Sequence, residues 1–460
     1  MIRQNSLYIF QKDFYNIQRF LSYIAKKYLT LRSKQLGHVD YTTKVKLLIT
    51  LSIIGQILSI TATWLTPTEI YLHIIITLVI ITAYPLYLVL AQVIILPLEY
   101  ILKQRIIRQA KEKLQTLKNI HIIGIVGSYG KTSTKHVLYH TYKNIVPTIT
   151  TSGNTNTLLG VANFILQEVQ PHHQVMIVEM GEHYTGDIKD LCNLLDPKTI
   201  VVAWLTLQHA ERMWDIDHIE KVLFEFRGHP SVQHVLINAD DPNLQKIKNK
   251  YPSDNYTNVE YITSATNIET QQNFAWIQWN YEGYNIQTRL LGKHSSIFIM
   301  MALHIAKHLK LDIASLIAPI QNIPYIEHRL QLMYNPVSDI YVIDDSYNGN
   351  IQWVRVTIQL IKDSNFDGKK IYITPWLMEL GSFADTIHTE MAHLIHDTFD
   401  LILLIENTNT QLIYRKLIEL GENQDKIIMF ANRDEAHTQL KKYTSHHSVI
   451  IFQNDIPQWF

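Results

Sequence analysis

Two long stretches without a charged residue stand out in the first quarter of the chain. Residues 47–65 contain no charged residue over 19 positions, and residues 70–98 contain none over 29. A helix of about 20 apolar residues crosses the hydrocarbon core of a bilayer, so each stretch is long enough to span it. A buried helical hairpin in a soluble domain is the alternative, but such uncharged lengths are uncommon there. The pattern predicts a transmembrane helical hairpin.

Basic residues flank this predicted hairpin on its outer sides only. Four residues, Thr66 to Glu69, separate the two stretches, whereas lysines and arginines precede the first and follow the second. Positive flanks stay in the cytoplasm, so the rest of the chain is expected there, anchored to the cytoplasmic (inner) membrane and its lipids. About forty residues precede the first stretch, which argues against a cleaved signal peptide. Residues 1–43 mix aromatic and basic residues and are interpreted as an interfacial helix.

Short apolar runs alternate with helical patterns in the remainder of the chain. Runs of four to eight apolar residues between helical intervals are typical of buried strands in α/β proteins, so we expect parallel sheets in two successive domains. The predicted organisation is a basic segment at 1–43, a membrane anchor and juxtamembrane helix at 44–118, and domains at 119–325 and 326–460. The predicted strands are 120–126, 175–179, 199–205, 234–239, 340–344, 370–374, 401–405, 426–430 and 448–452.

A turn containing two glycines follows the first of these strands. The string Gly127-Ser-Tyr-Gly-Lys-Thr-Ser-Thr134, here called the phosphate loop, would aim backbone N–H groups and a helix dipole at one place. We expect Lys131 to contact the β- and γ-phosphates of ATP and Thr132 to bind Mg²⁺. The full phosphate-binding motif has a glycine at the position of Ile125, which this chain lacks. The alternative to nucleotide binding is therefore an ordinary turn before a helix. The residues predicted to bind nucleotide here are Gly127, Ser128, Tyr129, Gly130, Lys131, Thr132 and Ser133.

Composition excludes several other classes of protein. Lysine plus arginine and aspartate plus glutamate both number 41, so no overall basic field suggests a nucleic-acid partner. The single cysteine, Cys192, excludes an intramolecular disulfide and a zinc ribbon. The chain is 47% apolar and 18% charged, which indicates folded domains with a lipid-facing addition.

Polar residues stand at or just after the ends of several predicted strands. Glu179, His209 and the pair Asp344–Asp345 occupy such positions, and open α/β sheets place their ligand sites at this edge. A carboxylate and an imidazole near the phosphate loop could hold Mg²⁺. Taken singly, each residue has an ordinary alternative, namely a helix-capping carboxylate or a structural histidine.

Ten short motifs, from about residue 120 to the C-terminus, occur in the order found in one enzyme family. On these motifs the chain resembles the Mur ligases, which form amide bonds with ATP. The strings D-D-S-Y-N and M-E-L-G look most like the branch that adds D-alanyl-D-alanine to the muramoyl tripeptide, and N-D-I-P resembles the ending of membrane-anchored relatives. The motifs are the phosphate loop, Thr151–Gly160, Val178–Gly181, Gly186–Ile188, His209–Glu211, Leu236–Asp241, Leu291–His294, His328–Leu330, Asp344–Asn348 and Met378–Gly381.

The resemblance implies a fold, a reaction and roles for particular residues. It implies a central ATP-binding domain with the phosphate loop, followed by a Rossmann-like C-terminal domain. ATP would phosphorylate a carboxylate of a muramoyl-peptide precursor, UDP-linked or lipid-linked, and an amino-acid or dipeptide donor would attack the acyl phosphate. The implied catalytic residues are Lys131, Glu179 and His209, and the implied Mg²⁺ ligands are Thr132, Glu179 and His209. Arg329 would reach the phosphates and Asp345 the ribose, although a linker ion pair and a turn are the alternatives.

Several positions depart from the family pattern. Leu223 stands where the resemblance implies a carbamylated lysine, with Lys221 two residues away. Ser295 and Phe298 replace two asparagines that would contact adenine, and Ile351 replaces a proline. A diverged, non-catalytic nucleotide-binding scaffold at the membrane is therefore the main alternative, and a transporter ATPase and a folyl-polyglutamate ligase are further ones.

Overall fold

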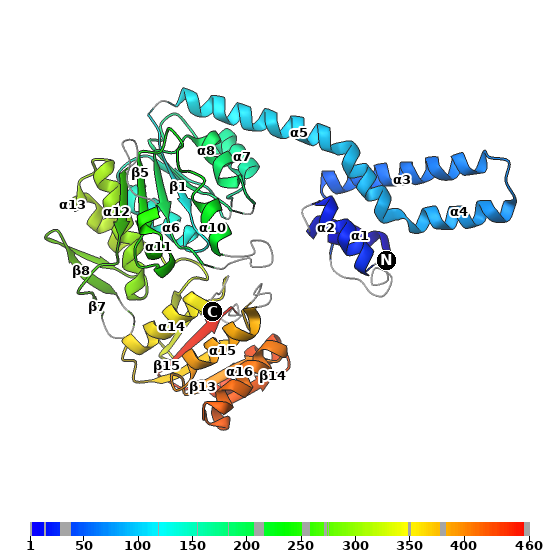
Figure 1. Ribbon diagram of the computed structural model, residues 1–460. Coiled ribbons are helices and arrows are strands. Elements are labelled where there is room, and N and C mark those ends of the chain that lie inside the picture. The colour runs from blue at the N-terminus through cyan, green and yellow to red at the C-terminus, as the bar shows by residue number, and fades with distance from the viewer. Residues whose placement is uncertain are drawn as a thin grey trace. The chain divides into compact units, whose positions relative to one another are not determined.

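The computed structural model of the protein describes residues 2–12, 15–27, 38–117, 119–153, 155–182, 184–206, 216–250, 258–270, 274, 276–347, 351–377 and 383–454. The chain forms two compact units, residues 1–108 and 109–460, and the division between them falls inside one long helix (Figure 1). Each unit has a hydrophobic core of its own.

The described part of the first unit is helical. Phe10 and Phe20, from the first two helices, lie with ring centroids 4.6 Å apart and are fully buried among residues of the third and fifth helices. The aromatic residues of the basic segment therefore pack inward, and its interfacial position stays a prediction. The helices are α1 Ile2–Lys12, α2 Ile17–Lys27, α3 Thr43–Trp64, α4 Ile70–Thr82 and α5 Tyr84–Thr116.

Helices α3 and α4 form a hairpin (Figure 1). The side-chain amide of Gln56 on α3 donates a hydrogen bond to the carbonyl oxygen of Ile80 on α4 at 2.8 Å. Many apolar side chains face outward, for example Leu58 at 63% exposed and Ile70 at 66%. Such exposure is unfavourable in water, so it agrees with a lipid-facing hairpin.

The second apolar stretch is divided between two helices, α4 and α5. Ala83 separates α4 from α5, and Pro85 lies in the first turn of α5, where a proline is tolerated because its missing N–H would be unpaired anyway. Helix α4, with 13 residues, rises about 20 Å and is shorter than the hydrocarbon core. Among the described residues, α3 and α5 are the helices long and apolar enough to cross a membrane. The membrane anchor itself stays a prediction.

The last turns of α5 belong to the second unit. The ammonium group of Lys111 donates to the carbonyl oxygen of Asn193 at 2.6 Å, and that of Lys113 donates to the carbonyl oxygen of Leu166 at 2.9 Å. Both carbonyl groups lie in the last turn of a helix, where a cation is favoured by the helix dipole.

A parallel six-stranded sheet forms the first part of the second unit. Its order is β2-β3-β1-β4-β5-β6, and its central strands are almost wholly buried apolar runs. Helix α6 contacts α12 and α13, whereas α8 contacts α7 and α10. The strands are β1 His121–Val126, β2 Thr148–Thr150, β3 Val175–Glu179, β4 Thr199–Val202, β5 His234–Asn238 and β6 Asn258–Ile262. The helices are α6 Lys131–Tyr142, α7 Leu158–Glu168, α8 Asp187–Leu195, α10 Ile216–Leu223, α11 Pro242–Lys246, α12 Ser296–His308 and α13 Ile313–Gln321.

A second six-stranded sheet follows, with the order β10-β11-β15-β12-β13-β14. Only β10 runs antiparallel to its neighbour. A small antiparallel sheet of β7 Glu269–Thr270, β8 Ile277–Tyr281 and β9 Tyr284–Thr288 precedes it. The strands are β10 Gln331–Asn335, β11 Ile340–Asp345, β12 Lys369–Thr374, β13 Leu401–Ile405, β14 Ile427–Phe430 and β15 Ser448–Gln453. The helices are α14 Ile351–Asp363, α15 Ala384–Ile395, α16 Thr408–Glu419 and α17 Arg433–Tyr443, with 3-10 turns η2 Lys248–Lys250, η4 Lys293–Ser295 and η6 Gln424–Lys426.

The α/β fold with parallel sheets is confirmed, and every predicted strand is present with its ends shifted by three residues or fewer. The strands that the sequence did not predict are β2, β6 and β10, at sheet edges, and the small sheet β7–β9. These strands are partly exposed and carry mixed residues, so they lack a continuous apolar run. The predicted boundary at 325/326 falls between α13 and β10 and stays a prediction, since both large sheets share one compact unit.

Candidate active site

Strand β1 ends in the phosphate loop, which leads directly into helix α6. Gly130 has a φ of 77°, a conformation open to glycine without strain. A Cβ atom at Gly130 would lie 2.3 Å from the indole ring of Trp204, so a larger residue would force that ring to move. The first N–H groups of a helix have no hydrogen-bond partner within the helix, and the phosphate loop leaves the first N–H groups of α6 pointing toward a common point at the helix N-terminus. The geometry is that of a site for an anion such as phosphate.

The ammonium group of Lys131, the predicted phosphate ligand, is paired within the chain. It donates to the carbonyl oxygen of Gly127 and to Oε1 of Glu182, the latter at 2.7 Å. The side chains of Lys131 and Glu182 are only 12% and 7% exposed, so water screens this ion pair weakly. Burial raises the pKa of Glu182, although Lys131 opposes the shift.

Glu179 brings the next predicted residues together. It ends β3, directly beside Ile125 of β1, so its side chain emerges next to the phosphate loop. The hydroxyl of Thr132 donates to Glu179 Oε2 at 3.1 Å, and the ammonium of Lys135 lies 3.3 Å from the same oxygen. Lys135 also donates to the carbonyl oxygen of Gly153 at 2.6 Å. The predicted pair Thr132 and Glu179 is therefore in direct contact, with a buried cation beside it.

The remaining side chains of the phosphate loop point into the protein. The N–H of Ser128 donates to the carbonyl oxygen of Trp204 at 2.8 Å, and its hydroxyl accepts from the N–H of Thr206 at 3.1 Å. The ring of Tyr129 stacks on that of Trp204 at 5.1 Å, and burial raises the Tyr129 pKa. The hydroxyl of Ser133 is buried with no hydrogen-bond partner among the described residues. The N–H and hydroxyl of Ser128 and the ring of Tyr129 are therefore already engaged within the protein.

Arg329, from the segment before β10, comes close to Glu179. Burial lowers the pKa of Arg329, while the nearby carboxylates of Glu179 and Asp345 oppose this shift. Its guanidinium group lies 5.1 Å from the ring centre of Tyr347. The structure thus brings a third cation toward the carboxylate that contacts Thr132.

Asp345, at the end of β11, is held by internal contacts. Its Oδ2 accepts hydrogen bonds from Gln453 at 2.8 Å and from the hydroxyl of Thr357 at 3.1 Å. Burial raises the Asp345 pKa to about 6, against the effect of these donors and of Arg329. Its predicted contact with a ribose stays a prediction. His209 lies outside the described residues, so its predicted metal and catalytic roles also stay predictions.

Comparison with known proteins finds relatives among the Mur ligases. Residues 125–306 match the family model of the Mur ligase middle domain. The UDP-N-acetylmuramoyl-tripeptide–D-alanyl-D-alanine ligase of Borreliella burgdorferi is 24% identical over 291 residues, which cover 62% of this chain and only 61% of that enzyme. The enzyme of the same name from Bacillus subtilis is 23% identical over 355 residues, covering 75% of each chain. The middle part of the chain is therefore similar to the Mur ligases.

Solved structures of Mur ligases share the fold. The crystal structure of a MurF ligase from Thermotoga maritima in complex with ADP matches with a TM-score of 0.63 at 19% identity, covering 76% of this chain and 80% of that one. A MurF structure from Acinetobacter baumannii matches with a TM-score of 0.64, covering 77% of each chain. The predicted resemblance to the Mur ligases is confirmed by these relatives, which are named as ligases.

Beside the phosphate loop, the protein has a cavity of about 360 Å³. Aromatic rings of Tyr129, Trp204 and Trp353 line it, and Asp241 and His294 lie at its polar side. Burial lowers the pKa of His294 to about 3, so its imidazole is neutral at pH 7. Flat apolar walls with a few polar groups suit a heterocyclic base, and the volume lies in the range of small-molecule sites.

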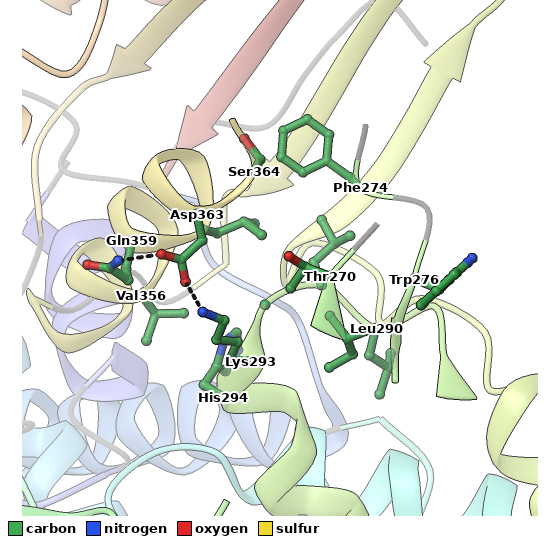
Figure 2. Close-up of a pocket in the computed structure, with 14 residues that line it drawn as sticks. Thr270, Phe274, Trp276, Leu290, Lys293, His294, Val356, Gln359, Asp363 and Ser364 are labelled. Atoms are coloured by element: carbon green, nitrogen blue, oxygen red, sulfur yellow. Dashed lines mark hydrogen bonds and ion pairs between the residues drawn. The ribbon is translucent and has the colours of Figure 1, made fainter. Parts of the chain in front are cut away.

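A second, smaller cavity lies between the small sheet and α14 (Figure 2). Its volume is about 150 Å³, and apolar side chains such as Leu290 and Val356 form much of its wall. Lys293 and Asp363 form an ion pair at 3.2 Å there, and the amide of Gln359 donates to Asp363 at 2.7 Å. Because these polar groups already satisfy one another, this cavity offers a ligand little directional recognition.

The position at which the family resemblance implies a lysine lies on α10. Leu223 is fully buried there, and Lys221 is exposed. Neither residue therefore contributes a buried amine to this part of the fold.

Four residues of the site were not predicted from the sequence: Lys135, Glu182, Trp204 and Trp353. A signal existed for one of them, because Lys135 follows Lys131 by four positions on a helix and so shares its face. Glu182 lies in a non-helical segment after β3, where its spacing from Glu179 gives no such signal. No local pattern distinguishes Trp204 or Trp353 from an ordinary core tryptophan.

Proposed function

We propose that this protein forms an amide bond with ATP through an acyl-phosphate intermediate, adding D-alanyl-D-alanine or a related amino compound to a muramoyl-peptide precursor of the cell wall. A carboxylate oxygen of the acceptor attacks the γ-phosphorus, and ADP leaves. The amine nitrogen of the donor then attacks the acyl carbon, the amine gives up a proton, and phosphate leaves. Positioning and charge neutralisation provide most of the catalysis in such transfers.

One observation carries the proposal, namely the hydrogen bond between Thr132 and Glu179. Glu179 ends β3, Thr132 lies where the phosphate loop enters α6, and Lys131 is its neighbour in the chain. A hydroxyl, a carboxylate and an ammonium group at the N-terminus of α6 combine affinity for phosphate with affinity for a cation. In this assignment Lys131 and the backbone of residues 127–130 hold the phosphates. Arg329 adds positive charge near the transferred group, and Asp345 meets the ribose.

The oxygen donors at this place fit Mg²⁺. Thr132 and Glu179 supply the hard oxygen ligands that Mg²⁺ prefers, and Oε2 of Glu182 is a further buried carboxylate oxygen that makes no hydrogen bond to a described residue. Thr132, Glu179 and His209 are the proposed metal ligands. When bound, Mg²⁺ would neutralise charge on the phosphoryl oxygens.

We also propose that the α3–α4 hairpin and α5 anchor the enzyme at the cytoplasmic membrane, with the domains at 119–325 and 326–460 in the cytoplasm. The exposed apolar side chains of the hairpin support this. An anchored enzyme would meet a lipid-linked muramoyl peptide at high effective concentration. Rates measured on UDP-linked and lipid-linked acceptors test this point, and equal rates for both after removal of the hairpin would contradict it.

ADP release in detergent, with Mg²⁺, muramoyl-tripeptide acceptors and a panel of amine donors, tests the ligase. We expect release that depends on both acceptor and donor, and a loss of about 100-fold or more in Lys131→Ala because a transition-state charge loses its partner. Lys250→Ala is the matched control, since Lys250 also pairs with a buried glutamate, Glu220, but lies outside the site. Nucleotide binding without ADP release for any substrate pair would instead indicate the scaffold.

A further inference from the structure

We propose that Glu182 is an additional ligand of the divalent cation that accompanies the nucleotide, and that its ion pair with Lys131 is the resting state of this ligand. The inference rests on the proposed function, because it requires a nucleotide in the phosphate loop. It assigns a role to a residue for which the sequence motifs gave none.

The burial of Glu182 is the first reason. The residue is 6% exposed, and Lys131 contacts only its Oε1 atom. Its Oε2 atom is buried and makes no hydrogen bond to a described residue. A buried carboxylate oxygen without a partner is costly, and a cation bound beside it would remove this cost.

The position of Glu182 is the second reason. Glu179 and Glu182 leave the same strand end three residues apart, and Glu179 is the carboxylate that contacts Thr132. The turn between them is tightly held, because Gly181 donates its N–H to the carbonyl oxygen of Asn156 at 2.9 Å. A Cβ at Gly181 would lie 2.9 Å from the side chain of Asn156, so the backbone approach itself requires glycine. Glu182 is therefore fixed beside the phosphate loop.

The balance of charge gives the third reason. Lys131 pairs with Glu182 and Lys135 pairs with Glu179, so each carboxylate already has a lysine before a nucleotide binds. A triphosphate placed beside two carboxylates meets repulsion unless additional positive charge arrives with it. A divalent cation held by Glu179 and Glu182 provides that charge. Lys131 is then released from Glu182 and becomes available to the phosphates.

This exchange predicts that Glu182 makes nucleotide binding dependent on the metal. In Glu182→Gln the side chain keeps its shape, but it loses the charge that holds Lys131 and attracts the cation. Nucleotide affinity without metal should rise, because Lys131 is free, and metal affinity should fall, because a ligand is lost. If Glu182 only competed for Lys131, the substitution would raise the nucleotide affinity and leave the metal affinity unchanged.

The test measures Mn²⁺ binding by electron paramagnetic resonance, with the full-length protein in detergent and saturating ADP. We expect Mn²⁺ affinity to fall by about 10-fold or more in Glu182→Gln. A fluorescent ADP analogue, titrated in EDTA, should bind the variant several-fold more tightly than the native protein. Glu220→Gln is the matched control: Glu220 is 4% exposed and also pairs with a lysine, Lys250. Both affinities should stay native in that control.

The outcomes separate the two proposals. If native protein with Mg²⁺ binds no adenine nucleotide, the proposed function fails. If it binds nucleotide but Glu182→Gln retains Mn²⁺ affinity within about twofold, only the role of Glu182 as a ligand is overturned. Glu182→Asp keeps the charge and moves it back by one methylene, so it carries the test if the glutamine variant does not fold. Reduced Mn²⁺ affinity in that variant supports the assignment, and native affinity overturns it.

Discussion

The two units of the chain place the same apolar residue types in opposite surroundings. In β3, Ile177 and its strand neighbours are fully or almost fully buried between helices, whereas in α4 Ile75 is 54% exposed and Leu78 is 59% exposed. An apolar run in a sheet is protected by its own protein, and an apolar run in this hairpin is not. Length separates the two cases, because strands here hold at most six residues and α3 holds 22.

Polar groups differ between the units in the same way. In the hairpin they are satisfied nearby: Gln56 bonds to the backbone of the partner helix, and Thr68 contacts His73, whose ring stacks on Trp64 at 4.9 Å. In the second unit, charged side chains gather at the strand ends and pair with one another around the phosphate loop. The first arrangement suits a surrounding without water, and the second suits a site that exchanges partners when a ligand arrives.

The largest expected effect comes from a charge in the buried strand. Ile177→Arg places a guanidinium group in the centre of the parallel sheet with no acidic partner, so we expect a loss of more than about 4 kcal/mol in unfolding free energy and little soluble folded protein. Thermal unfolding and solubility in detergent measure this. Ile177→Val, as the control, should cost about 1 kcal/mol. Native stability of the arginine variant would show that this sheet is not the core described.

An isoleucine-to-arginine substitution in the hairpin should weaken membrane association and leave the stability of the second unit unchanged. Ile75→Arg lies on an exposed face of α4, so we expect membrane association to weaken by up to about 3 kcal/mol, the cost of an arginine in the hydrocarbon core. The unfolding temperature of the nucleotide-binding unit should stay unchanged. Flotation with liposomes gives the first quantity, and unfolding with and without ADP gives the second. Native flotation of the variant, with Ile75→Leu as the control, would mean that this face does not meet lipid.

The smallest of these three effects is on the pH dependence of stability, through the buried carboxyl group of Asp345. The folded pKa of Asp345, about 6, lies above the ordinary aspartate value of 3.8, so the folded state binds the additional proton between these pH values. Stability therefore falls as pH rises through this range, by about 2 kcal/mol between pH 4.5 and 6.5. Urea unfolding at several pH values measures it. In Asp345→Asn this component should vanish, and an unchanged pH dependence would show that Asp345 is not the group responsible.

The sequence predicted the central strands and the phosphate loop because both are local signals. A continuous apolar run such as Val175–Glu179 indicates a buried strand, and the glycine turn before Lys131 indicates an anion site. The edge strands were not predicted, because each is partly exposed and therefore lacks a continuous run of apolar residues. The role of Glu182 depends on a tertiary contact with Lys131, 51 positions earlier, and no spacing rule links the two.

The two lysines near the end of α5 have a practical consequence for removing the anchor. Lys111 and Lys113 supply positive charge to the ends of α7 and α8, and such a cation at a helix end contributes about 0.3–1 kcal/mol. A soluble form cut immediately before His121 would lose both amines and leave two carbonyl groups without these donors. A form that starts at Gln109 keeps them. Truncated enzymes beginning at 109 should therefore be the more heat-resistant of the two.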